Sequence, residues 1–177
     1  MNTSEKIDMR IIRTQNNLKN SFYELRKTLP LEKIKVRDLC RQAMINPSTF
    51  YDHYLDIYDL SNQLEDRLID ECFSNFVGKE LLLLDTKSFL SGIYETIQAH
   101  RQMFFTLFNE RFEIMYRKME KYLEDYYCNL YSKKYDSVLI SFIISGTMHC
   151  MEELENSNSK DLEEVLDKVN EIINKLV

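Results

Sequence analysis

The sequence contains few of the residues that most often interrupt helices. It has only three glycines, two prolines and no tryptophan in 177 residues. So few glycines exclude the Gly-rich loops that cradle phosphates in many nucleotide-binding enzymes. Long apolar runs are also missing, since runs such as residues 81–84 and 138–144 fall far short of the ~20 residues that cross a bilayer. We therefore expect no membrane span.

Cysteine and histidine pairs at the spacing of metal sites are absent as well. The four cysteines are widely spaced without a Cys-x-x-Cys pair, and the three histidines lie far apart. Zinc and redox motifs need such pairs, so we expect no metal, no cofactor and no enzymatic activity. No signal-peptide pattern is recognised, and cysteines packed in the core of a reduced, cytoplasmic protein explain the spacing better than disulfides.

The residues that are abundant favour helices. Apolar residues make up 44% of the chain and charged residues 29%, which provides material for a packed core, and Leu, Ile, Met, Glu and Lys dominate a sequence with few turn residues. We therefore predict an all-α fold. The apolar periodicity predicts about nine helices, at residues 6–27, 36–43, 47–54, 57–77, 86–100, 101–108, 111–131, 135–154 and 160–176.

Charge is divided unevenly along the chain. The net charge is −6, yet residues 1–55 hold ten Lys and Arg against six Asp and Glu, while residues 56–177 hold 13 against 23. A basic head on an acidic body is expected where only the head approaches phosphate. We place a domain boundary after residue 56, between a head at residues 1–56 that we expect to approach DNA and a body at residues 57–177.

Two short predicted helices in the head are separated by a tight turn. Residues 36–43 form the first helix and residues 47–54 the second. Asn46 is a favoured N-cap, and Pro47 suits the first helical position, where the backbone N–H has no partner. Two short helices joined in this way form the helix-turn-helix pattern, in which the second helix fits the DNA major groove.

Residues 36–60 read VRDLCRQAMINPSTFYDHYLDIYDL and resemble the head of the TetR (tetracycline-repressor-like) family of transcriptional regulators. The likeness lies in the Ser-Thr-Phe-Tyr run at residues 48–51, the aromatic Tyr54 and the entry to the next helix at residues 57–60. In the rest of the chain, the length, the helix order, a Phe-rich segment and the Ser-Gly-Thr run at residues 145–147 are similar to a divergent C-terminal subgroup. The resemblance implies double-stranded DNA as partner. The implied DNA contacts are Lys35, Arg37, Asn46, Pro47, Ser48, Thr49, Tyr51, His53 and Tyr54.

Two positions depart from the family's pattern. Met44 replaces the glycine usual in the turn, and Ile57 replaces the lysine usual at the start of the connecting helix. Methionine does not easily adopt a positive φ, and isoleucine cannot anchor phosphate. An alternative interpretation of the head is a plain helical domain whose aromatic residues are core and whose basic residues are merely solvated.

The body contains a Phe- and Met-rich stripe at helical spacing. Such stripes are more often core than a ligand site. If the body follows the family, however, soft and aromatic side chains would suit a small apolar or aromatic effector. The candidate effector residues are Phe104, Phe108, Phe112, Met115, Tyr116 and Met119.

The last two predicted helices carry more apolar surface than a small body easily covers, and we expect them to form a homodimer. Gly146 lies within one of these helices, either because two backbones approach closely there or because it accommodates a bulky neighbour within the chain. The expected interface residues are Leu139, Phe142, Ile143, Gly146, Cys150, Leu166, Val169 and Ile173.

These expectations combine into a dimeric regulator, more specifically a repressor, that binds a palindromic operator and responds to an effector. The alternative is a helical protein-interaction module that keeps the head only as structure. DNA binding through several Lys and Arg weakens steeply with salt, whereas an apolar protein contact does not, so salt dependence separates the two hypotheses.

Overall fold

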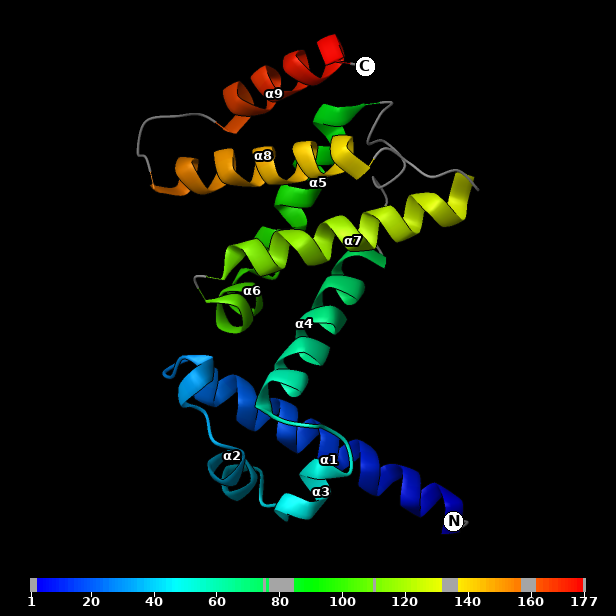
Figure 1. Cartoon of the computed structure of the whole chain (residues 1–177), viewed down its shortest axis with the longest axis vertical. Helices are drawn as coiled ribbons and strands as arrows, with labels where there is room; N and C mark the ends of the chain where they lie inside the picture. Colours follow the sequence, from blue (N-terminus) through cyan, green and yellow to red (C-terminus); the bar gives the residue numbers. More distant parts are fainter. Residues whose placement is uncertain are drawn as a thin grey trace. The chain divides into compact units, whose positions relative to one another are not determined.

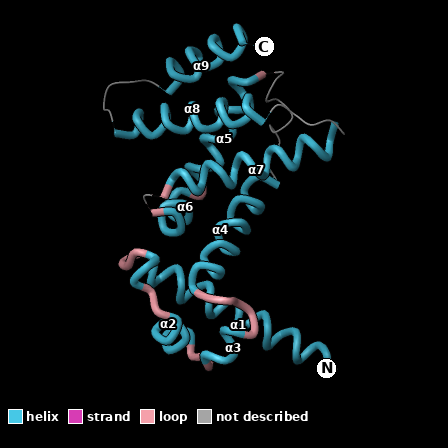
Figure 2. Tube along the Cα trace, viewed as in Figure 1, coloured by secondary structure: helices cyan, strands magenta, loops and turns pink. Residues whose placement is uncertain are grey.

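The computed structural model describes residues 3–74, 76, 85–109, 111–131, 137–156 and 162–176. This part of the chain holds nine α-helices, one short 3₁₀-helix and no strand (Figures 1 and 2), which confirms the predicted all-α fold. The elements are α1 (Thr3–Arg26), η1 (Leu31–Lys33), α2 (Val36–Ala43), α3 (Pro47–Tyr51), α4 (Ile57–Ser74), α5 (Thr86–Ala99), α6 (Arg101–Phe108), α7 (Phe112–Tyr131), α8 (Ser137–Asn156) and α9 (Leu162–Leu176).

Most helix ends follow from local chemistry. α1 ends at Arg26, shortly before Pro30, whose ring disfavours helical geometry in the residue before it. α3 ends at Tyr51, before the predicted end at residue 54. The Phe50 carbonyl there accepts from two amides, that of His53 at 3.0 Å and that of Tyr54 at 2.9 Å. The shorter α3 makes the exposed second helix a single compact turn.

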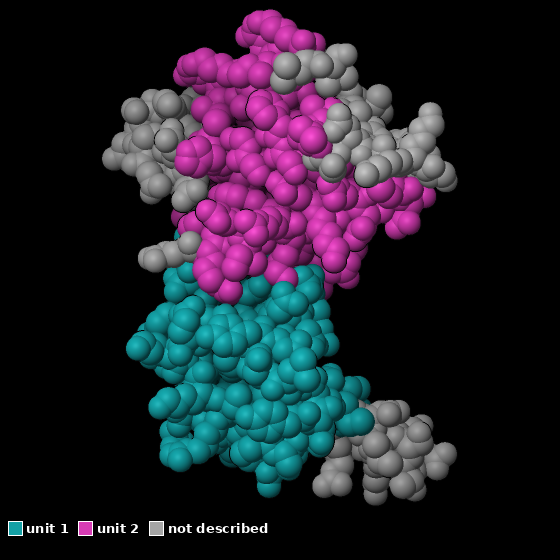
Figure 3. Space-filling model, in the orientation of Figure 1, with its two compact units in different colours: residues 1–67, 102–109 teal, residues 68–101, 110–177 magenta. Residues whose placement is uncertain are grey.

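The chain divides into two compact units, coloured separately in Figure 3. The N-terminal unit comprises Met1–Arg67 and Gln102–Asn109, and the C-terminal unit comprises Leu68–Arg101 and Glu110–Val177. This division differs from the predicted boundary at residue 56, because Ile57, Leu60 and Leu64 on the first half of α4 are buried. α6 also belongs to the N-terminal unit, although its residues were predicted in the body.

The core of the N-terminal unit fixes how α1, α2 and α3 pack. Apolar side chains at helical spacing turn one face of each helix inward. Arg26, only 3% exposed, lies at the end of α1. Its guanidinium donates to the Leu29 carbonyl at 3.0 Å and to the Leu107 carbonyl of α6 at 2.9 Å. The buried apolar residues are Leu18, Phe22, Leu31, Ile34, Leu39, Cys40, Ala43, Phe50, Tyr54, Ile57, Leu60, Leu64, Phe104, Leu107 and Phe108.

The C-terminal unit is built around aromatic contacts. Phe76 lies 6.1 Å from Phe73 and 5.8 Å from Phe89, measured between ring centroids. On the surface, the Lys87 ammonium on α5 pairs with Asp167 of α9 at 2.5 Å and with Glu163 at 2.8 Å. Hydrogen bonds to Asp167 and then to Glu163 raise the pKa of Lys87, so the ion pairs join α5 and α9 across the whole neutral range.

Gly92 on α5 allows close packing against Phe76. A Cβ added at Gly92 would lie 2.4 Å from the Phe76 ring, inside van der Waals contact. We therefore predict that Gly92→Ala lowers the free energy of unfolding by about 1–2 kcal/mol, because overpacking outweighs the better helix propensity of alanine. Urea denaturation followed by circular dichroism measures this change. Ser91→Ala, next to it on α5, is the control, and a more stable Gly92→Ala would contradict the packing argument.

The cysteines only partly follow the prediction that they are core residues. Cys40 and Cys72 are buried, whereas Cys128 and Cys150 are exposed, so the prediction is wrong for the last two. Burial, reinforced by Glu71, raises the pKa of the Cys72 thiol to about 11. Cys72 is therefore protonated at neutral pH and a poor nucleophile.

No helix among the described residues has both the length and the apolar character that spanning a membrane requires.

Candidate nucleic-acid interface

The turn between α2 and α3 has a left-handed backbone at Met44. Its φ is 55° and its ψ is 45°, the conformation that most often takes glycine at a helix end. The Met44 amide donates to the Arg41 carbonyl at 3.3 Å, and the Ile45 amide to the Cys40 carbonyl at 3.0 Å. These bonds close the end of α2 and turn the chain toward α3, although the residue in the turn is a methionine.

Met44 therefore has a strained backbone conformation. The residue is 88% exposed. A left-handed residue other than glycine costs about 1–2 kcal/mol, and little packing would be lost on truncation. We predict that Met44→Gly raises the free energy of unfolding by about 0.5–1 kcal/mol, after allowing for the greater chain entropy of glycine. Urea denaturation tests this prediction. Met44→Ala should give no comparable gain, and destabilisation by glycine would contradict the strain.

The start of α3 is fixed by a side-chain cap. The Asn46 carboxamide oxygen accepts from the Ser48 amide at 3.0 Å and from the Ser48 hydroxyl, also at 3.0 Å. Pro47 occupies the first helical position. This cap satisfies a backbone donor that the helix cannot satisfy itself, so the five-residue helix begins at a defined point, as the sequence predicted.

One side of α3 is buried and the opposite side is exposed. Phe50 is fully buried, and the neighbouring Tyr51 is 59% exposed, with its ring 5.3 Å from the Phe50 ring in an edge-to-face contact. Ser48 and Asp52 are exposed on either side of Phe50 in sequence. Successive helical residues are 100° apart, so Ser48 and Asp52 point away from the core. α3 thus presents polar and aromatic groups on its outer surface.

Most of the predicted contact residues reach this surface. Lys35, Arg37, Asn46, Pro47, Ser48 and Tyr51 are exposed, and Thr49 and His53 are half-buried.

Tyr54 is the exception. It is 5% exposed and its ring lies 5.4 Å from the Phe50 ring. Burial raises the pKa of its phenol, which therefore stays neutral at physiological pH. Its packing argues against Tyr54 as a contact residue. Tyr54 lies four residues after the buried Phe50, and its amide donates to the Phe50 carbonyl at 2.9 Å, so both rings face inward.

The exposed cations lie beside α3 and not on it. Lys33, Lys35 and Arg37 precede or begin α2, and all three are exposed. Ile57, the first residue of α4, is buried. It therefore packs in the core and leaves the start of α4 without a positive charge. The exposed cations nearest to α3 in sequence on its N-terminal side lie in α2 and just before it.

The candidate effector residues are mostly packed. Phe104, Phe108, Met115 and Met119 are buried, while Phe112 and Tyr116 are half-buried. Within α6 the Phe104 and Phe108 rings stack at a centroid distance of 6.0 Å. None of the six lines either of two pockets of the N-terminal unit, which lie between α1 and α6.

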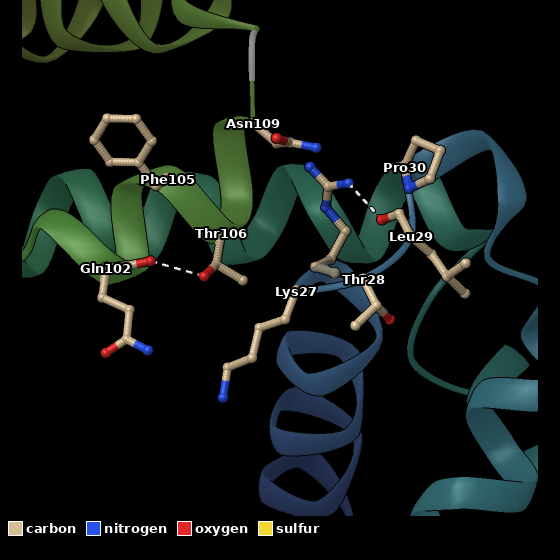
Figure 4. Close-up of a pocket in the computed structure, with 9 residues that line it drawn as sticks. Lys27, Thr28, Leu29, Pro30, Gln102, Phe105, Thr106 and Asn109 are labelled. Atoms are coloured by element: carbon tan, nitrogen blue, oxygen red, sulfur yellow. Dashed lines mark hydrogen bonds between the residues drawn. The ribbon is translucent and has the colours of Figure 1, made fainter.

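A pocket that sequence reasoning missed lies within the N-terminal unit, between the end of α1 and α6 (Figure 4). It has a volume of about 340 Å³ and is lined by polar and apolar surface in nearly equal parts, with Phe105 among the lining residues. No local pattern could reveal it, because residues about 80 positions apart form its walls. The lining residues are Arg26, Lys27, Thr28, Leu29, Pro30, Gln102, Phe105, Thr106 and Asn109.

The expected dimer residues divide between core and surface. Phe142, Gly146 and Cys150 on α8 are exposed, and Leu139 and Val169 are half-buried. Three others require correction: Ile143, Leu166 and Ile173 are buried within the protomer, because α8 and α9 turn these side chains toward the C-terminal unit's own core.

Gly146 has open space beside it. A Cβ added there would have no neighbour within 4 Å. This argues against a bulky neighbour within the chain as the reason for the glycine. Val138 is not among the expected interface residues, but it is also exposed, one helical turn before Phe142. Val138, Phe142 and Gly146, four residues apart, form one exposed face, which we call the α8 face.

No group of three or more His, Cys, Asp or Glu side chains suited to a metal ion occurs in the part of the chain that the structure describes. Comparisons with protein-family models, with curated proteins and with solved structures found no significant match.

Proposed function

We propose that this chain is a sequence-specific DNA-binding transcriptional regulator of the TetR type, acting as a repressor on a palindromic operator. The observation that carries the proposal is the outer surface of α3. A short capped helix follows a tight turn and presents Ser48, Thr49 and Tyr51, with Lys35 and Arg37 beside it. Hydroxyl groups and cations in this arrangement suit base edges and phosphates of a major groove.

Selection of bound duplexes from random DNA tests this proposal. The wild-type chain should enrich a palindromic motif, and Tyr51→Ala should lose that enrichment while remaining folded. Phe105→Ala is a matched control, because it removes an exposed aromatic ring from the same unit but not from the helix-turn-helix. If a folded wild-type chain enriches no motif, the regulator proposal fails.

Homodimerisation is the second part of the proposal. Palindromic operators require two recognition helices related by two-fold symmetry. The α8 face is apolar and exposed, with Phe142 at its centre 54% exposed, and a second copy of the chain would bury it. Gly146 would let the two backbones approach closely. Release by a small apolar or aromatic effector in the C-terminal unit belongs to the same proposal.

Sedimentation velocity tests the dimer. Phe142→Glu should raise the dimer dissociation constant at least about tenfold, because a charge would be buried against an apolar partner. Phe105→Glu makes the same substitution on an exposed Phe of α6 and should leave the dimer intact. Equal sedimentation of wild type and Phe142→Glu would exclude the α8 face as the interface.

The lack of cations on α3 itself favours a second candidate function. In this alternative the chain is a helical protein-interaction module, and the head serves only as structure. Salt dependence discriminates between the two, because DNA affinity falls steeply with rising salt as counterions compete for phosphate, whereas an apolar protein contact changes little.

A further inference from the structure

The segment around α3 is poor in positively charged residues. No lysine or arginine occurs between Arg41 and Arg67, yet carboxylates occur at Asp52, Asp56 and Asp59. Recognition surfaces for DNA are normally basic, since each phosphate contact gains from a nearby cation. The three carboxylates that directly follow α3 in sequence therefore need an explanation.

Two of the three are used to start α4. An Asp56 carboxylate oxygen accepts from the Tyr58 and Asp59 amides, each at 2.8 Å. An Asp59 oxygen accepts from the Leu55 amide at 2.9 Å, and its other oxygen accepts from the Gln63 side chain at 3.2 Å. The Asp56 bonds satisfy amides in the first turn of α4, where a negative charge also complements the helix dipole, and the Asp59 bonds hold the chain that enters the helix. Asp56 and Asp59 are thus structural.

Asp52 has no such role. Its carboxylate is exposed and has no hydrogen-bond or ion-pair partner among the residues that the structure describes. It closes α3 with helical angles, φ −69° and ψ −19°. Two residues after the buried Phe50, it points about 200° around the helix from that ring. Asp52 is therefore among the residues that extend furthest from the core on α3.

We propose that Asp52 is a specificity-determining residue that selects cytosine in the operator; this inference rests on the proposed function. A carboxylate can only accept hydrogen bonds. In the major groove, cytosine presents an N4 amino donor, whereas guanine and thymine present acceptor oxygens that repel a carboxylate. Adenine carries an amino donor too, but its N7 acceptor lies beside it. Cytosine is the base that best matches Asp52.

The negative charge of Asp52 also disfavours nonspecific binding to DNA. A carboxylate on the outer surface of α3 is repelled by the DNA phosphates unless a base donor compensates for its lost hydration. Asp52 thus weakens binding to DNA that lacks a cytosine at the matching position. The neighbouring cations, such as Lys35 and Arg37, supply the phosphate contacts that hold α3 in the groove.

Parallel selections from random duplex DNA with wild type, Asp52→Ala and Glu32→Ala test the inference. Glu32→Ala removes an exposed carboxylate of the same unit, on η1 and outside the helix-turn-helix. Wild type and Glu32→Ala should enrich cytosine at one position of each half-site. Asp52→Ala should lower that cytosine preference about tenfold and leave the other positions unchanged. It should also bind mixed-sequence duplex more tightly, by several-fold.

The outcomes separate the two proposals. A wild-type motif that Asp52→Ala enriches with unchanged base preferences overturns the role of Asp52 and leaves the regulator function standing. A wild-type chain that is folded and enriches no motif overturns the regulator function, and the role of Asp52 with it. Thermal unfolding of the three proteins by circular dichroism should agree closely, because both substituted side chains are exposed.

Discussion

Replacing Arg26 by glutamine lowers the free energy of unfolding by about 3 kcal/mol, because a buried, hydrogen-bonded charge is lost and backbone carbonyls are left unsatisfied. Arg26 is buried at the end of α1 and donates to the carbonyls of Leu29 and Leu107. Carbonyls at the end of a helix have no partner within the helix, and a cation there also complements the helix dipole. Glutamine is too short to reach both.

Urea denaturation followed by circular dichroism measures the effect of Arg26→Gln. Lys27→Gln is the matched control. Lys27 follows Arg26 in the chain, but its ammonium is exposed and pairs with Glu24 at 2.6 Å on the surface. An exposed pair contributes roughly 0–1 kcal/mol, so the control should change stability by less than that. Equal stability losses for the two variants would contradict a special role for Arg26.

The adjacent aromatics Phe50 and Tyr51 should respond oppositely to truncation. Phe50→Ala is expected to lower the free energy of unfolding by about 3–4 kcal/mol, because it leaves a cavity where a fully buried ring packed. Tyr51→Ala should change stability by about 0.5 kcal/mol or less, as is usual for an exposed side chain. It should instead weaken binding to the selected duplex at least about tenfold, through lost contacts with phosphate and base.

Denaturation and fluorescence anisotropy with labelled duplex measure the two effects separately. Tyr51→Phe distinguishes the hydroxyl from the ring: restored affinity would assign the contact to the ring, and lost affinity would assign it to the hydroxyl. Undiminished DNA binding by a folded Tyr51→Ala would contradict the proposed interface, and an unchanged stability of Phe50→Ala would contradict the packing of α3.

The helix-turn-helix was predictable because its signals are local. Asn46 and Pro47 mark the start of α3, and apolar residues on α2 mark its inward face, so neighbouring residues alone determine the pattern. The end of α3 was less predictable. Helical spacing places Tyr54 on the same face as the buried Phe50, and a DNA contact for Tyr54 was implied only by the family resemblance. No local signal marks the end of the regular helix at Tyr51.

Contacts between distant residues could not be predicted in this way. Nothing near Arg26 in sequence indicates the Leu107 carbonyl, 81 positions away, or that α6 belongs to the N-terminal unit. On α8, Phe142 and Ile143 are equally apolar, yet one is exposed and the other buried. Periodicity shows which residues share a face, but only packing shows which face is already covered.

The most direct test of the central claim is to map the DNA-binding surface by nuclear magnetic resonance. A short mixed-sequence duplex is added at low salt to the ¹⁵N-labelled chain, and the amide shifts are followed. The proposed function predicts that the largest changes occur at residues 35–37 and 46–53 and that they disappear when salt is raised. Absence of shifts, or shifts concentrated outside the helix-turn-helix, would contradict it.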